Sequence, residues 1–296
     1  MVCAFLFSVL VVQFRKDQAS LIYSMAFYAL GSLFFSIYVF LSPELMEIRG
    51  GRYFIAEENP NSTSSRLAIA ITIAFYLAIE NPLNIKSKSV RVMMILANIP
   101  LFILIMNSGS RGGLLTMIGS VLLYLTFSSV SKRVKWFILS TLLLLSFFLS
   151  GYLLQFDTMI DRLIISFVNG DSGGRGEIWS NAITIISNNI LIGVGERGYF
   201  SEMYNLSYNF IDTHNLYLYI LASGGVLSFI PLVAFQIKIF SSAYKELKLR
   251  NVLPILLFLN VNLIAIRTGG VLTYFLMWYL LAMAASFKLY KKHVIT

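Results

Sequence analysis

Charged residues are scarce in this sequence: Asp, Glu, Lys and Arg together make up 12% of its 296 residues. Soluble globular domains contain about 25% charged residues, whereas 57% of this chain is hydrophobic. One water-soluble core could not hide that much apolar surface, which excludes an ordinary cytosolic protein. We therefore predict an integral membrane protein that crosses the bilayer several times.

Cysteine and histidine are nearly absent as well, with one Cys and two His in the whole chain. The single cysteine, Cys3, cannot form an internal disulfide bond, and no Cys/His cluster has the spacing of a zinc site. The predicted outer loops lack the paired acidic motif of metal-assisted transferases, and there is no phosphate-binding loop for ATP. We therefore expect neither a metal nor a cofactor.

Long apolar runs are what the sequence contains instead. Eight of them approach the roughly 20 residues needed to cross a bilayer, and their unbroken hydrophobicity indicates helices rather than barrel strands. They are residues 19–42, 62–81, 90–107, 114–130, 136–154, 214–237, 252–267 and 270–287. The run from Val2 to Phe14 is typical of the end of a ninth span, so we expect further helices upstream. The predicted fold is an all-α polytopic bundle of about 8–9 transmembrane helices.

Lysine and arginine cluster in alternate loops of this arrangement. These loops contain Arg15 and Lys16, residues 86–91, residues 132–135, residues 238–250 and residues 288–292. The positive-inside rule assigns such loops to the cytoplasm. We therefore predict a multi-pass protein of the plasma (inner) membrane with its C-terminus cytoplasmic and Met1 outside.

Three parts follow from this topology. The N-terminal transmembrane helices (1–154) include an outer loop at 43–61, the outer side then holds a large loop (155–213), and C-terminal helices with a basic cytoplasmic tail complete the chain (214–296). The large loop is too long for a connector. Apolar residues recur at helical spacing in 159–167 and 178–186, which predicts amphipathic helices there.

The net charge of +9 takes on a different meaning when it is sorted by side. The basic excess lies inside and reflects topology, so we expect no nucleic-acid partner. Every outward basic residue is an arginine: Arg49, Arg52, Arg66, Arg111, Arg162, Arg175, Arg197 and Arg267. Arginine binds phosphate through two parallel hydrogen bonds and stays charged when desolvated. These arginines indicate an anionic ligand with phosphate groups, or else ion pairs and headgroup contacts, which is the more natural interpretation for Arg66, Arg162 and Arg267.

Two outward residues stand apart from this set. Arg111 lies in a tight, glycine-rich turn where the backbone can approach a ligand closely, and its charge opposes the positive-inside preference. His214 is the only outward histidine, and an imidazole can act as a base near neutral pH, although a lone histidine at a membrane edge more often has a structural role. A Ser-His-Asp hydrolase is disfavoured because no G-x-S-x-G elbow is present. The G-x-G-x-x-G string at 193–198 lies in an irregular outer loop, so we interpret its glycines as turn residues.

Four short motifs occur in a fixed order. They are Ser110-Arg111-Gly112-Gly113, Gly174-Arg175-Gly176-Glu177-Ile178-Trp179, Leu191-Ile192-Gly193-Val194-Gly195, and Thr213-His214-Asn215 followed by Gly224-Gly225. In order, spacing and membrane side, this combination resembles the O-antigen ligase/polymerase superfamily over roughly residues 45–240. The segment 49–61 is similar to the outer loop that precedes the first motif in that family.

The resemblance implies a metal-independent glycosyltransferase of the helical membrane type, with its active site extracytoplasmic. Its donor would be an oligosaccharide linked to undecaprenyl diphosphate, held by Arg111 and Arg175, and His214 would act as the base on the acceptor glycan. Further substrate-binding residues would be Arg49, Arg52, Arg197 and Asn215. Membrane lipid and a chain-length regulator are the other partners that it implies.

The motifs leave the acceptor open. We expect a polymerase of surface polysaccharide repeats, and the alternative is an O-antigen ligase that transfers finished polymer to lipid A core. A transporter of small anions would also use outward arginines. It is disfavoured because the predicted helix interiors are almost free of ionisable residues.

Overall fold

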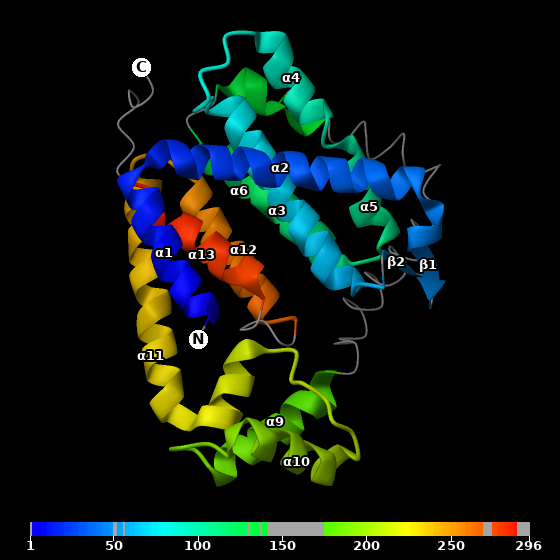
Figure 1. Cartoon of the computed structure of the whole chain (residues 1–296), viewed down its shortest axis with the longest axis vertical. Helices are drawn as coiled ribbons and strands as arrows, with labels where there is room; N and C mark the ends of the chain where they lie inside the picture. The colour runs from blue at the N-terminus through cyan, green and yellow to red at the C-terminus, as the bar shows by residue number, and fades with distance from the viewer. Residues whose placement is uncertain are drawn as a thin grey trace.

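The computed structural model describes residues 2–49, 52–55, 57–128, 131–136, 138–140, 175–268 and 274–288. These residues are mostly helical, as predicted, with one small antiparallel sheet (Figure 1). Among them, four helical stretches are long and apolar enough to cross a membrane: α2 (Gln18–Leu41), α3 (Pro60–Ile79), α4 with α5 (Lys88–Asn107) and α11 (Leu216–Lys248). Three shorter apolar helices are α6 (Arg111–Phe127), α12 (Leu253–Ala265) and α13 (Phe275–Ser286).

The apolar runs thus predict the positions of most helices. The run 136–154 lies largely outside the described residues, so the total of 8–9 spans stays a prediction. The run 90–107 is not one regular helix, because α4 (Lys88–Leu96) and α5 (Ile99–Asn107) are separated at residues 97–98. Pro100 in the first turn of α5 lacks an N–H group, and the Asn98 amide donates to the carbonyl oxygens of Met94 and Ile95 at 2.7 and 3.2 Å.

Helix α3 forms the centre of the bundle and packs against α2, α5, α6 and α12. Nearly all of its side chains from Leu67 to Ala78 are buried. Small residues allow this close approach, which is the usual way for helices to associate in a membrane. At Gly113 of α6, a Cβ atom would lie only 2.3 Å from Ser64 Oγ of α3. The contact between α3 and α6 therefore fixes the N-terminal end of α6.

The basic loops collect at one end of the molecule. Helices α1 (Val2–Lys16) and α2 meet beside the end of α13, where Arg15 donates two hydrogen bonds to the Ala285 carbonyl at 2.8 and 3.2 Å. Figure 1 shows this junction, α4 and the C-terminus toward the upper end of the view, and α9 and α10 at the lower end. The charge asymmetry of the sequence therefore has a counterpart in the arrangement of the helices. The assignment of the upper end to the cytoplasm remains a prediction.

A small layer lies at the opposite end, and we call it the outer layer because the predicted topology puts this end outside. It consists of α9 (Arg175–Asn188), α10 (Gly195–Ser207) and the first turns of α11, with its own core of Ala182, Ile185, Tyr199, Met203 and Ala222. The helix predicted over 178–186 is confirmed, although Ile183 is 56% exposed and Ile185 is buried instead. The other predicted amphipathic helix, 159–167, lies outside the described residues.

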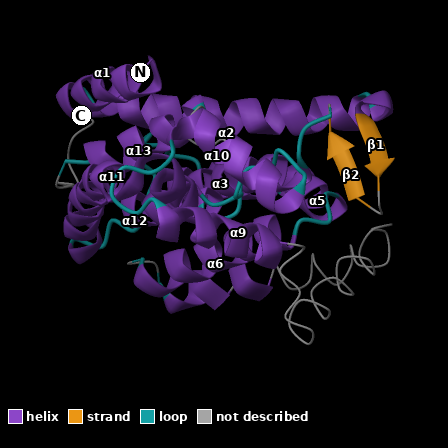
Figure 2. Cartoon of the chain, turned by 90° about the horizontal axis from the view of Figure 1, so that it is seen from below, coloured by secondary structure: helices purple, strands orange, loops and turns teal. Residues whose placement is uncertain are grey.

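The second outward element is a hairpin of β1 (Met46–Arg49) and β2 (Arg52–Ile55), paired in the register Met46 with Ile55 and Arg49 with Arg52. Figure 2 shows it at the end of α2, beside α5. The sequence predicts an outer loop at 43–61 but no strands. The hairpin brings Arg52 next to the turn that carries Arg111.

Helix α11 is not the single straight span predicted from 214 to 237. Gly225 interrupts it with φ 61° and ψ −168°, so the first turns belong to the outer layer and the long apolar part begins after the break. Only glycine adopts such a conformation readily. The correction matters for the site, because His214 stands at the start of the displaced outer part.

Candidate functional site

The turn between α5 and α6 is held by a short hydrogen-bond network. Ser110 caps α6 by accepting the Gly113 N–H at 3.1 Å, and its hydroxyl lies 3.0 Å from Asn61 Oδ1. The Arg52 guanidinium donates to the same Asn61 oxygen at 2.9 Å and to the Ser108 carbonyl at 3.2 Å. Arg52 therefore fixes the turn that carries Arg111. Its predicted contact with substrate stays a prediction.

Arg267 lies directly on the first turn of α6. Its Nη2 donates to Thr116 Oγ1 at 2.9 Å, and its Nε donates to the Leu263 carbonyl at 3.0 Å. A Cβ atom on Gly112 would come within 2.3 Å of Arg267 Nη1. The missing side chain of Gly112, the residue after Arg111, therefore leaves the space that the Arg267 guanidinium occupies.

Arg175 lies near both Arg111 and Arg267. Burial lowers its pKa, and the nearby charge of Arg111 lowers it further. Burial also lowers the pKa of Arg267, with a second contribution from the charge of Arg175. We refer to Arg111, Arg175 and Arg267, all half-buried, as the arginine cluster. Within the described residues, neither Arg175 nor Arg267 forms an ion pair with a carboxylate.

Helix ends reinforce the positive potential of this cluster. Arg111 is the first residue of α6, directly after the Ser110 N-cap, and Arg175 is the first described residue of α9. The N-terminus of a helix carries roughly half a positive charge, which disfavours cations and favours anions. The N-terminal end of α6 therefore adds to the positive potential around Arg111, which favours an anion there.

His214 lies beside α9. The Trp179 indole N–H, one turn after Arg175, donates to the Thr213 carbonyl at 2.9 Å, which ties α9 to the residue before the histidine. His214 has φ 51°, a left-handed conformation that costs a non-glycine residue about 1–2 kcal/mol. Its backbone N–H donates to Asp212 Oδ1 at 2.7 Å. The half-buried imidazole has no hydrogen-bond partner in the described part of the chain.

Two glycine motifs hold this arrangement together. At the break in α11, the Val226 and Leu227 N–H groups donate to the carbonyls of Ile190 and Leu191, and Ala222 accepts from the Val194 N–H at 3.0 Å. The turn before α10 thus satisfies backbone groups that the kink leaves free. The turn and the kink meet at Gly193 and Gly225. A Cβ atom on either glycine would lie 2.3–2.6 Å from backbone atoms of the other segment. The G-x-G-x-x-G string is therefore a packing turn, as predicted, and not a nucleotide site.

The other predicted substrate-binding residues lie apart from the cluster or have structural roles. Arg49 is exposed and ion-paired with Glu47 of its own strand, and it stacks over the Phe54 ring at 5.5 Å. Arg197 is exposed on α10, with no hydrogen bond or ion pair among the described residues. Asn215 caps α11, its Oδ1 accepting the Tyr217 N–H at 3.0 Å. No contact places Arg49 or Arg197 at the arginine cluster, and the substrate contacts of all three residues stay predictions.

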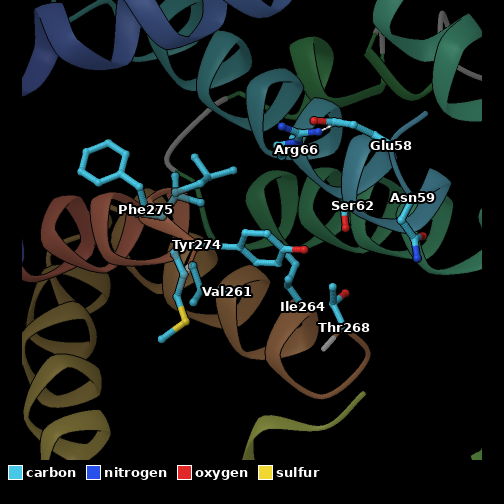
Figure 3. A pocket seen from close by; sticks show the side chains of 12 residues that line it. Glu58, Asn59, Ser62, Arg66, Val261, Ile264, Thr268, Tyr274 and Phe275 are labelled. Carbon is cyan, nitrogen blue, oxygen red and sulfur yellow. Dashed lines mark ion pairs between the residues drawn. The ribbon is translucent and has the colours of Figure 1, made fainter. Parts of the chain in front are cut away.

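A cavity of about 390 Å³ lies between the first turns of α3, the end of α12 and the start of α13, at the end of the bundle that is predicted to face outward. The Tyr274 side chain points into it, and the Arg66–Glu58 ion pair forms part of its wall (Figure 3). This ion pair confirms the structural interpretation of Arg66. Thr268, the residue after Arg267, also lines the cavity.

Sequence reasoning missed the place of Arg267. It predicts headgroup contact or ion pairing for this residue, whereas the structure puts it in the arginine cluster. Arg162 lies outside the described residues. Among the residues that the structure describes, no group of three or more His, Cys, Asp or Glu side chains is arranged to hold a metal ion. Metal independence remains a prediction to be tested directly.

Residues 96–233, which contain Arg111, Arg175 and His214, match the family described as O-antigen ligase. The match supports the O-antigen ligase/polymerase superfamily for this part of the chain. The resemblance predicted from the four motifs is confirmed. No curated protein matches the chain. The superfamily indicates a function of O-antigen ligase or polymerase type, carried out by glycosyltransferase-like membrane enzymes.

Proposed function

We propose that this protein is a polymerase-type glycosyltransferase that joins surface-polysaccharide repeats at the outer face of the plasma membrane. The donor is a glycan linked to undecaprenyl diphosphate, and the acceptor is the next lipid-linked repeat. The observation that carries this proposal is the arginine cluster beside a histidine without a side-chain partner among the described residues. No nucleotide sugar is available outside the cell, so the energy for the new bond has to arrive with the lipid diphosphate.

The chemistry follows from the charges. The acceptor hydroxyl attacks the anomeric carbon of the donor sugar while the bond from that carbon to the diphosphate oxygen breaks. The diphosphate leaves with the bonding electron pair, and Arg111 and Arg175 stabilise the negative charge that develops on it. The His214 imidazole takes the proton of the attacking hydroxyl. Attack opposite the leaving group inverts the anomeric configuration of the donor sugar.

Three cations suit a diphosphate that would otherwise need a metal ion. Arginine offers two parallel N–H donors to phosphate and keeps its charge when half-buried. We therefore expect transfer by the purified protein to be insensitive to EDTA. Loss of transfer in EDTA that returns on adding Mg²⁺ or Mn²⁺ would refute this part of the proposal.

The decisive experiment uses the purified chain and a defined undecaprenyl-diphosphate-linked repeat. We expect products longer by whole repeats, with inverted configuration at the new linkage. Products with the configuration of the donor would refute the direct displacement.

A ligase that transfers polymer to lipid A core is the second candidate, because the matched family carries that description. Gene deletion separates the two. A polymerase mutant displays surface lipid with a single repeat, whereas a ligase mutant accumulates long polymer on its lipid carrier. Loss of anion uptake with unchanged polysaccharide would instead revive a transporter.

A further inference from the structure

The two sides of the arginine cluster differ in chemistry. On one side, the Trp179–Thr213 hydrogen bond ties the first turns of α9 to His214. On the other side, the chain passes from Arg267 directly to Thr268, which lines the cavity of about 390 Å³. This volume falls within the range of about 300–1,000 Å³ that is typical of ligand pockets. The cluster therefore has a titratable group on one side and a ligand-sized cavity on the other.

The lining of the cavity is graded from polar to apolar. Asn59, Ser62 and Thr268 supply polar groups, and Ser62 Oγ is buried with no hydrogen-bond partner within the described part of the chain. The rest of the lining is mainly apolar, with Val261, Ile264, Phe275, Leu276, Met277 and Leu280. Among the described residues of the lining, the charged side chains are Arg66 and Glu58, which form an ion pair with each other. Such a lining suits an apolar chain that ends in a polar group.

We propose that this cavity holds the isoprene units nearest the diphosphate of the donor, and that Arg267 binds the phosphate that carries the lipid. The inference rests on the proposed function and gives the donor an orientation. The lipid points toward α12 and α13, and the sugar points toward His214. Arg267 is placed for this role because it donates a hydrogen bond to Thr116 and its guanidinium occupies the space beside Gly112, on the first two turns of α6.

Cysteine labelling tests the occupant of the cavity. The background is Cys3→Ser, which removes the one native cysteine, and Ile264→Cys puts a thiol in the cavity wall. The rate of modification by a small membrane-permeant thiol reagent is measured with undecaprenyl diphosphate, inorganic pyrophosphate or phosphatidylglycerol added. We expect undecaprenyl diphosphate to slow modification by about tenfold, because pockets bury about 70–90% of a ligand's surface. Pyrophosphate and phosphatidylglycerol should leave the rate near that of the free protein.

Leu263→Cys is the matched control, because Leu263 is adjacent on α12 and 42% exposed away from the cavity. Its modification should not respond to any of the three probes. Equal protection of both cysteines, or equal protection of Ile264→Cys by phosphatidylglycerol, would overturn the proposal. Protection by pyrophosphate alone would show a phosphate in the cavity and would overturn it too.

A kinetic variant separates this inference from the proposed function. Ile264→Phe narrows the cavity and should raise KM for the lipid-linked donor several-fold with kcat nearly unchanged, since ground-state and transition-state binding fall together. The melting temperature in detergent checks that the variant is folded. If the wild-type chain transfers glycan, but undecaprenyl diphosphate does not protect Ile264→Cys and Ile264→Phe keeps the wild-type KM, only the cavity assignment fails. If the wild-type chain transfers nothing, the proposed function itself fails.

Discussion

The outward arginines form two groups with opposite surroundings. Arg49 and Arg66 each form an ion pair with a glutamate close in the chain, Glu47 and Glu58 respectively. Arg175 and Arg267 instead lie near other arginines, and burial together with that like charge lowers their pKa values. The first group completes its electrostatics within the protein. The second group is stabilised best when an anion comes from outside, and it is the group that adjoins His214.

Replacing an arginine of the second group should have the largest effect. Arg175→Lys keeps the positive charge but loses two-point binding of phosphate. We expect transfer of lipid-linked repeats to fall by about 100- to 1,000-fold, the usual effect of removing one preorganised donor from a developing anion. Arg133→Lys is the control. Arg133 is exposed in the basic segment 132–135, at the opposite end of the molecule, and its exchange should leave transfer unchanged. Polymer of near-normal length from the Arg175 variant would remove the distinction between the two groups.

The histidine beside the cluster comes next. His214→Asn should lower transfer by at least about 100-fold, because the proton of the acceptor hydroxyl loses its base. Asparagine is chosen because it tolerates the left-handed backbone at this position better than alanine does. Binding of the donor should persist, since the arginines are intact. A variant that binds donor and still elongates chains would remove His214 from the chemistry.

Gly112→Ala tests Arg267 without changing a charge. The added methyl group would overlap Arg267 Nη1, so the guanidinium has to move off the first turn of α6. We expect transfer to fall by about tenfold, because a displacement of about 1 Å in a positioned group can be this costly. Gly119→Ala is the control, since a Cβ atom there meets nothing within 4 Å on the same helix. Equal activity of the two variants would mean that the place of Arg267 does not matter to the reaction.

The helices of the bundle could be predicted because their signal is local. An unbroken apolar run can satisfy its backbone in lipid only as a helix, so α2 and α3 begin and end within two residues of their predicted bounds. Arg111, Arg175 and His214 are predicted as site residues in the same local way, from short motifs of neighbouring residues. The family match covers all three of them.

Features set by distant residues could not be predicted. The break at Gly225 depends on hydrogen bonds with the backbone of residues 190–194, which lie more than thirty positions earlier in the chain. The place of Arg267 depends on the absence of a side chain at Gly112, on another helix. Nothing in the local sequence at 267 distinguishes it from an arginine at the headgroup level, which is why its position emerges only from the packing of α12 on α6.

The smallest effect is expected for the first group of arginines. Arg49→Lys weakens a surface ion pair and a stacking contact with Phe54, so the free energy of unfolding should fall by less than about 1 kcal/mol. Transfer should change by less than about threefold, because no contact of Arg49 reaches the arginine cluster within the described residues. Thermal melting in detergent and the distribution of polymer lengths measure the two quantities. A loss comparable to that of Arg175→Lys would show that the hairpin binds substrate directly, and that an arginine paired in the protein exchanges its glutamate for the ligand.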